Sequence, residues 1–261
     1  MNVLDSLNNY KFYTCKNSNY SNFRHFGVRM LQNRIEVYLD DFSDNKIEEF
    51  KNQIHNSQVI TFSKSEGDFI LQSSLNLGEA VNNQINEGSI GYRARDAQGN
   101  VGIVVSGHLI KKGETLYQNQ TPVGYCDDKS MRFYDIDAAF VETFDNYIPT
   151  NNIGGSYGIL STTITVPQVG TSITKYGKST KATVGKILDT SDTFDLRSDG
   201  GPIHTDFVKA DYTASSGDSG GIVFTTFGKQ TSGIHVGVNG AGYTYYCKAS
   251  NINKQFGLTR Y

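Results

Sequence analysis

Short runs of alternating apolar and polar residues dominate the chain from about Leu77 to its end, and Gly, Asn and Asp interrupt them at close, regular intervals. This spacing is typical of a β-sandwich or β-barrel. Helical periodicity returns only near the end, at Ala249–Phe256. The pattern predicts strands at Ser89–Arg95, Val101–Ser106, Ala138–Thr143, Gly158–Thr165, Ser172–Tyr176, Ala182–Asp189, Ile222–Thr226, Thr231–Val238 and Tyr243–Cys247.

The first part of the chain has a different pattern. Residues 1–30 are polar, rich in Asn and without periodicity, so we expect a loop there. Arg34–Leu39 alternates like a strand, apolar residues then recur at helical spacing after the capping-type residue Ser43, and Val59–Phe62 is again extended. The pattern therefore predicts a small β-α-β module before the β-rich region.

The composition narrows the classes of partner. The 24 basic and 26 acidic side chains leave a net charge of −2, so nothing favours a nucleic-acid partner, which would require a basic excess. Apolar runs are far shorter than the roughly 20 residues of a membrane-spanning helix, so we expect no membrane partner. The three cysteines, Cys15, Cys126 and Cys247, allow at most one disulfide, and no signal peptide is recognisable in this chain.

The stretch Ser215–Gly221 carries the strongest chemical signal. It sets Ser219 among glycines, and Gly217 lacks a Cβ, so the N–H groups of Gly217 and Ser219 can turn toward one point as an oxyanion hole. A Gly-rich surface turn would have the same composition. The serine also fits the nucleophile elbow of α/β-hydrolases, but no Asp or Glu follows Gly220, so the acid that this fold needs is missing.

A nucleophilic serine needs a base, and His108 is the best of the five histidines. It follows the apolar run Val101–Val105, and Gly107 frees the backbone to end the strand and aim the imidazole. His204, in contrast, comes just after the Gly/Pro-rich stretch Gly200–Pro202, and we interpret it as a solvated loop residue.

The base needs an acid that orients it, and Asp137 is the preferred candidate. Period-two alternation places Asp137 on one strand face with Ala139 and Val141, where a carboxylate can be buried against a histidine. Asp135 has the same parity but a more polar flank, and it remains the alternative.

Three motifs, Ser-Gly-His ending at His108, Asp-x-Ala-x-Val beginning at Asp137 and Gly-Asp-Ser-Gly-Gly around Ser219, together resemble the chymotrypsin family of serine proteases. Their order and spacing, and the run Tyr176–Lys186, are similar to short bacterial members such as streptogrisins, alpha-lytic protease and the glutamyl endopeptidases. The resemblance covers about Leu77–Tyr261. It implies a mostly β protein whose residues 77–261 form two antiparallel six-stranded β-barrels, preceded by a pro-region-like α/β segment over residues 1–76.

The resemblance also implies roles for single residues. The catalytic triad would be His108, Asp137 and Ser219 in the cleft between the barrels, with Gly217 and Ser219 as the oxyanion hole. Asp218 would pair with a buried cation that supports this loop; Lys175 is the candidate, and an exposed Lys175 is the alternative. One departure is the Leu that follows His108, where the family often has Cys, so the disulfide beside the histidine cannot form.

The expected primary pocket does not suit a basic side chain. Thr213 stands where trypsin-like members have Asp, so no buried anion would meet a Lys or Arg. The segment around His235 resembles Gly-Ile-His-x-Gly of glutamyl endopeptidases and a similar segment of picornaviral chymotrypsin-like cysteine proteases. An imidazole donor with nearby hydroxyls suits Glu, with Gln second; alternatively His235 is a strand residue bonded to its neighbours. The candidate pocket residues are Thr213, Ser215, Ser216, His235, Val236 and Gly237.

The sequence therefore predicts a serine endopeptidase that forms an acyl-enzyme and needs no metal or organic cofactor. We expect a monomer that acts on protein or peptide substrates, and the resemblance implies a secreted or extracellular location. The alternatives are a catalytically silent double-barrel binding protein and a zymogen held inactive by its N-terminal segment. Arg34–Ile70 resembles the region before the protease in some bacterial homologues, and we expect its removal near residues 76–88, after Glu79 or Glu87.

Overall fold

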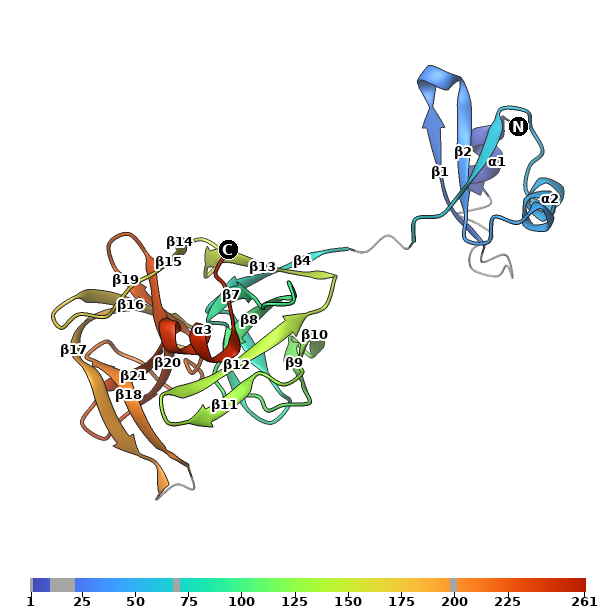
Figure 1. The fold of residues 1–261 in the computed structure, drawn as a ribbon. Coiled ribbons are helices and arrows are strands. Elements are labelled where there is room, and N and C mark those ends of the chain that lie inside the picture. The colour runs from blue at the N-terminus through green and yellow to red at the C-terminus, as the bar shows by residue number, and fades with distance from the viewer. Residues whose placement is uncertain (1, 10–21, 68–70, 198–200) are drawn as a thin grey trace. The chain divides into compact units, whose positions relative to one another are not determined.

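The computed structural model describes residues 2–9, 22–67, 71–197 and 201–261, and it divides into two compact units. Residues 1–70 form the N-terminal unit and residues 71–261 the C-terminal unit, and each is described by itself (Figure 1). Within the described part of the chain, no helix combines the length and apolar character needed to cross a membrane.

The N-terminal unit is a small sheet with helices. Its strands lie in the order β1-β2-β3, with β2 antiparallel to β1 and parallel to β3. Alternate residues of β2 face a core that also contains Phe50 of α2. The elements are α1 (Val3–Asn9), β1 (Phe23–Arg29), a 3-10 turn (Met30–Gln32), β2 (Arg34–Leu39), α2 (Asp44–Gln53) and β3 (Ile60–Lys64).

The expected β-α-β module is therefore present, but the expectation of a loop over residues 1–30 is wrong where the structure describes them. Both α1 and β1 bury an apolar side chain, Leu7 and Phe23, in the core of this unit. Such short polar segments have little propensity of their own, so packing rather than local pattern defines them. Cys15 lies outside the described residues.

The first barrel of the C-terminal unit is a sheet whose two ends meet in one run of chain. The strand order is β6-β5-β9-β10-β12-β8-β7, and only Ile90 and Gly91 separate β6 from β7. Counting that bent run as one strand, the sheet closes with six strands, and β11 pairs with β12 at its side. The strands are β5 (Ala80–Asn82), β6 (Glu87–Ser89), β7 (Tyr92–Arg95), β8 (Val101–Val105), β9 (Glu114–Gln118), β10 (Thr121–Cys126), β11 (Ser130–Phe133) and β12 (Ile136–Thr143).

A small side sheet sets the start of the C-terminal unit. It contains β4 (Ser73–Leu77), β13 (Tyr147–Ile153) and β14 (Gly158–Ile159), with β4 parallel to β13. The expected boundary between residues 76 and 77 falls inside β4, so the unit begins earlier than expected. The alternation in β4 covers only Leu75–Leu77 and is too short to predict a strand; its pairing with β13, far along the chain, defines it.

The second barrel closes through β20, which pairs with both β19 and β21. Its six strands follow the order β20-β19-β16-β17-β18-β21, and β15 adds to β20 from outside. Two six-stranded antiparallel barrels are thus present, as expected. The elements are β15 (Ser161–Ile164), β16 (Ser172–Gly177), β17 (Lys181–Asp195), β18 (Ile203–Ala210), β19 (Ile222–Thr225), β20 (Gln230–Val238), β21 (Thr244–Lys248) and α3 (Ala249–Phe256).

One continuous apolar cluster joins the two barrels. It includes Val104 and Phe140 of the first barrel and Ile222 and Ile234 of the second. Cys126 and Cys247 are buried as free thiols rather than as a disulfide. The shared core fixes the barrels against one another, so loops from both can contribute to one site.

Candidate active site

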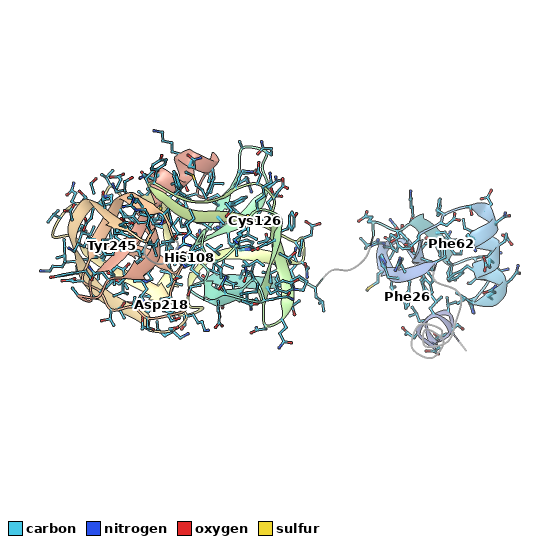
Figure 2. The ribbon with its side chains drawn as sticks, turned by 90° about the horizontal axis from the view of Figure 1, so that it is seen from below. Phe26, Phe62, His108, Cys126, Asp218 and Tyr245 are labelled. Carbon is cyan, nitrogen blue, oxygen red and sulfur yellow. The ribbon has the colours of Figure 1, made fainter. Side chains whose placement is uncertain are left out.

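His108 lies just beyond the end of β8 and is held by Asp137 of β12 in two places. The Asp137 Oδ1 atom accepts the backbone N–H of His108 at 2.9 Å, and Oδ2 lies 2.8 Å from the ring Nδ1. Gly107 makes this approach feasible, because a Cβ there would lie 2.3 Å from the carbonyl oxygen of Met131. In Figure 2 His108 lies between the green strands of the first barrel and the orange strands of the second.

The charge of Asp137 determines the tautomer of His108. Asp137 is fully buried, and burial alone would raise its pKa, but the charge and hydrogen bonds of His108, with a smaller contribution from His204, outweigh burial and hold the pKa below its ordinary value. An ionised carboxylate only accepts hydrogen bonds, so Nδ1 of His108 carries the hydrogen. The Nε2 atom of neutral His108 is then free to accept a proton.

Ser219 comes from the second barrel, in the turn before β19, and it lines the same cavity as His108. This cavity has a volume of about 560 Å³ and is also lined by Ser216 and Gly217. The Ser219 hydroxyl donates to the carbonyl of Val236 over 3.4 Å, and the described residues contain no hydrogen bond between Ser219 and His108.

The backbone before Ser219 presents two unused donors. The hydroxyl of Ser179 donates to the carbonyl of Ser216 at 2.6 Å, and because the peptide is trans, the N–H of Gly217 points the opposite way. Gly217 has a φ of 91°, a left-handed conformation that glycine adopts without strain. Among the described residues neither the Gly217 nor the Ser219 N–H meets a protein acceptor. The turn can therefore bind an oxyanion.

A buried ion pair holds this turn. Lys175 and Asp218 are both fully buried, and Lys175 Nζ lies 2.9 Å from Asp218 Oδ2, so the expected pairing is present and the alternative of an exposed Lys175 is wrong. Asp218 also accepts the Thr180 hydroxyl and the backbone N–H groups of Ser179, Thr180 and Ser215. Although burial raises the pKa of Asp218, these donors and Lys175 lower it to about 2.

The structure separates the candidate pocket residues. Val236 and Gly237 line a second cavity, of about 300 Å³, that is also lined by His108 and Asp137. Ser216 lines the first cavity, whereas Thr213, Ser215 and His235 line neither of the two.

His235 is almost completely buried, with 2% of its surface exposed. Its Nδ1 lies 3.0 Å from the hydroxyl of buried Tyr212, and the described residues offer no partner to its Nε2. Burial, with a smaller contribution from the charge of Lys175, lowers the pKa of His235 to about 3, so the ring is neutral near pH 7. The alternative, a strand histidine bonded to its neighbours, accounts for the hydrogen bond of Nδ1 but not for the missing partner of Nε2.

Comparison with known structures identifies the architecture. A protease from Nocardiopsis aligns with a TM-score of 0.63 and 24% identity, over 72% of this chain and 99% of its own. Protease A from Thermobifida fusca gives a TM-score of 0.62 and 21% identity, over 72% of this chain and 98% of its own. A glutamic acid specific serine protease is described as using a histidine triad in substrate binding. It aligns with a TM-score of 0.62 and 22% identity, over 72% of this chain and 100% of its own.

The C-terminal unit has the chymotrypsin-like fold. The structural neighbours are bacterial chymotrypsin-like serine proteases. Residues 1–65 match a family model described as a Pro-like C-terminal domain. A search of curated protein sequences finds no match.

Within this fold, two groups near the site were not identified from the sequence. Arg132 lines both cavities, with its Nε 4.0 Å from Asp137 Oδ2, and a Glu87–Lys178 ion pair lines the larger cavity. Arg132 is the register partner of Asp137 across the β11–β12 hairpin, and that register is absent from a single sequence.

The interpretation of His204 as a solvated loop residue is wrong. His204 lies in β18, is completely buried, and its Nε2 lies 4.0 Å from Asp137 Oδ2. The Gly/Pro-rich stretch ends at Pro202, and β18 begins at the next residue, Ile203. The sequence interpretation therefore extended the loop too far along the chain.

The two halves of the buried ion pair should contribute unequally to stability. In Asp218→Asn the Lys175 ammonium stays buried with only neutral acceptors, on Thr180 and Lys181, which should cost about 3–5 kcal/mol of unfolding free energy. Lys175→Met leaves the Asp218 carboxylate with four other donors and should cost less, about 1–3 kcal/mol. Urea unfolding of the full chain, followed by circular dichroism, measures both values.

The double variant Lys175→Met/Asp218→Asn is the control, and the sum of the two single losses should exceed its loss. Because the folded pKa of Asp218 is about 2, its stabilising contribution is complete above the unfolded pKa of about 3.9 and is lost as the pH falls toward 2. A larger loss in Lys175→Met than in Asp218→Asn contradicts this assignment.

Proposed function

We propose that the C-terminal unit is a serine endopeptidase with His108, Asp137 and Ser219 as its catalytic triad. The observation that carries the proposal is the junction of the barrels, where a carboxylate-held imidazole and a serine hydroxyl line one cavity. The fold shared with bacterial serine proteases supports it. Protein or peptide chains are the substrates, and secretion stays a prediction of the family resemblance.

In this mechanism the Ser219 hydroxyl first breaks its hydrogen bond to the Val236 carbonyl and donates instead to Nε2 of His108. His108 takes the hydroxyl proton as the oxygen bonds to the substrate carbonyl carbon, and Asp137 stabilises the imidazolium. The N–H groups of Gly217 and Ser219 bind the negative oxygen that forms. His108 then gives its proton to the leaving amine, and water, deprotonated by the same imidazole, releases the acyl group and regenerates the serine.

A fluorophosphonate probe should label the wild-type protein at Ser219, because only an activated serine attacks the phosphorus atom. Ser219→Ala should abolish labelling, and His108→Ala should lower peptide turnover by about 10⁴-fold or more while leaving the fold intact. Mass spectrometry of the labelled peptide identifies the residue. Absence of labelling, both before and after limited proteolysis, would favour the silent binding protein.

We further propose that the enzyme prefers Glu before the scissile bond, with Gln second. If the Tyr212 hydroxyl donates to Nδ1 of His235, the neutral ring carries its hydrogen on Nε2, the atom without a protein partner. A substrate carboxylate accepts hydrogen bonds from that N–H and from the hydroxyl of Ser215 or Ser216, whereas an aliphatic side chain accepts none. The glutamic acid specific neighbour, which is described as binding substrate through histidines, supports this preference.

Peptides that differ only in Glu, Gln, Leu or Arg before the cleaved bond test this preference. We expect kcat/KM for Glu to exceed that for Leu or Arg by at least about 10-fold, since an unpaired buried donor disfavours the other side chains. His235→Gln keeps one N–H donor and should keep part of the preference, whereas His235→Leu should remove it. A Leu or Arg optimum in the wild type contradicts the assignment.

The N-terminal unit is proposed as a removable pro-region, and the match of residues 1–65 to a family model described as a Pro-like C-terminal domain supports this role. The expected cleavage after Glu79 or Glu87 needs correction, because β4 to β6 are integral to the C-terminal unit and the Glu79 carboxylate bonds to Asn76. Glu66 is exposed and is the only glutamate between β3 and β4. Cleavage after Glu66 separates the two units and leaves the sheets of both units whole.

On prolonged incubation the wild-type chain should split into two fragments at Glu66–Gly67. Glu66→Gln should slow the split at least about 10-fold, and Ser219→Ala should prevent it. Intact-mass measurement over time gives the cleavage position. An active protein whose mass never changes contradicts the pro-region assignment, and a cut inside β4 to β6 contradicts Glu66 as its site.

A further inference from the structure

A second histidine lies against the carboxylate that holds His108. His204 is completely buried in β18, and its ring packs against Phe194 and Phe207 at centroid distances of 5.1 and 4.8 Å. Its Nε2 is the one fully enclosed side-chain nitrogen or oxygen, among the described residues, that has no hydrogen-bond partner. Such an atom in a close-packed interior requires an explanation.

The other ring nitrogen fixes which atom carries hydrogen. Nδ1 of His204 lies 3.1 Å from the carbonyl oxygen of Tyr134, and a carbonyl can only accept, so Nδ1 is protonated. Tyr134 is held at a φ of 49°, a strained conformation for a non-glycine residue, and the same oxygen also accepts the N–H of Thr205. A neutral ring then has its lone pair on Nε2.

The nearest carboxylate oxygen to this nitrogen is one that His108 already uses. Nε2 of His204 lies 4.0 Å from Oδ2 of Asp137, and the same Oδ2 lies 2.8 Å from Nδ1 of His108. The charged and titratable groups around His204 are Asp137 on β12, Arg132 on β11 and His108 beyond β8. Of the other packing elements, β17 presents the ring of Phe194, and the thiol of Cys247 on β21 bonds to the Asp135 carbonyl.

We propose that His204 is a positioning residue for Asp137 that works by protonation: when neutral it leaves Oδ2 to His108, and when protonated it competes with His108 for Oδ2. The inference rests on the proposed triad.

Burial lowers the pKa of His204 more than the nearby Asp137 charge raises it, so the ring is neutral around pH 7 and gains its proton only in more acidic solution. The added proton makes Nε2 a charged donor 4.0 Å from Oδ2. Asp137 then divides its charge between two imidazoles, and His108 loses basicity and alignment. Turnover therefore falls in acid through two protonations, one on His108 and one on His204.

Two replacements separate the nitrogen atoms. His204→Asn retains an N–H near the position of Nδ1, for the Tyr134 carbonyl, and has nothing in place of Nε2. His204→Gln places a permanent, non-titrating N–H₂ donor near the position of Nε2. Circular dichroism and thermal unfolding of each full-length variant establish that it is folded.

The first test is the pH dependence of kcat/KM. In the wild type the acid limb on logarithmic axes should steepen toward a slope of about two, and in His204→Asn it should stay at about one. His204→Gln should have a kcat at least about fivefold below that of His204→Asn at pH 8, with KM changed less than about twofold, because its donor competes permanently for Oδ2. Equal slopes in the wild type and His204→Asn, or equal kcat values in the two variants, would overturn the proposal.

The second test does not depend on activity. In full-length Ser219→Ala, nuclear magnetic resonance should detect the proton between His108 Nδ1 and Asp137, and its signal should move downfield as His108 protonates. It should move back as the His204 ring protonates at lower pH. If the signal ignores His204, or His204 never titrates in the folded protein, the inference fails. A wild type that neither cleaves peptides nor reacts with fluorophosphonate would instead refute the proposed function.

Discussion

The buried carboxylate of Asp137 is the constraint on which the site depends. Its two oxygens accept the backbone N–H and the ring Nδ1 of His108, so one side chain sets both the path of the chain after β8 and the orientation of the imidazole. Burying a carboxylate is costly, and here the interactions with His108 outweigh that cost and keep it ionised. The free Nε2 of His108 follows directly from this arrangement.

Each barrel contributes one such carboxylate. Asp137 positions the loop of His108 in the first barrel, and Asp218 has the corresponding role in the second. It is buried against Lys175, accepts hydrogen bonds from backbone N–H groups and holds the turn that carries Ser219. The barrels share a continuous apolar core, so two separately organised loops face each other with little freedom. Catalytic geometry of this kind requires that the supporting groups be fixed before substrate binds.

Much of the site, and the helix near the end of the chain, could be predicted because local sequence signals mark them. Ser219 stands in a Gly-rich turn, His108 follows an apolar strand and a glycine, and the helix Ala249–Phe256 has both periodicity and a terminating glycine. Arg132 and His204 were missed for a different reason. Hairpin register brings Arg132 beside the carboxylate, and the register of β17 with β18 likewise sets Phe194 against His204, so neither position follows from its neighbours in sequence.

The distance between His108 Nε2 and Ser219 Oγ tests the central claim most directly. A crystal structure of the full chain, free and after reaction with a peptidyl phosphonate, would measure it. We predict that Oγ leaves the Val236 carbonyl, bonds to phosphorus and lies within about 3.2 Å of Nε2, with the phosphonate oxygen on the N–H groups of Gly217 and Ser219. An imidazole turned out of reach of Oγ in both structures would contradict the account.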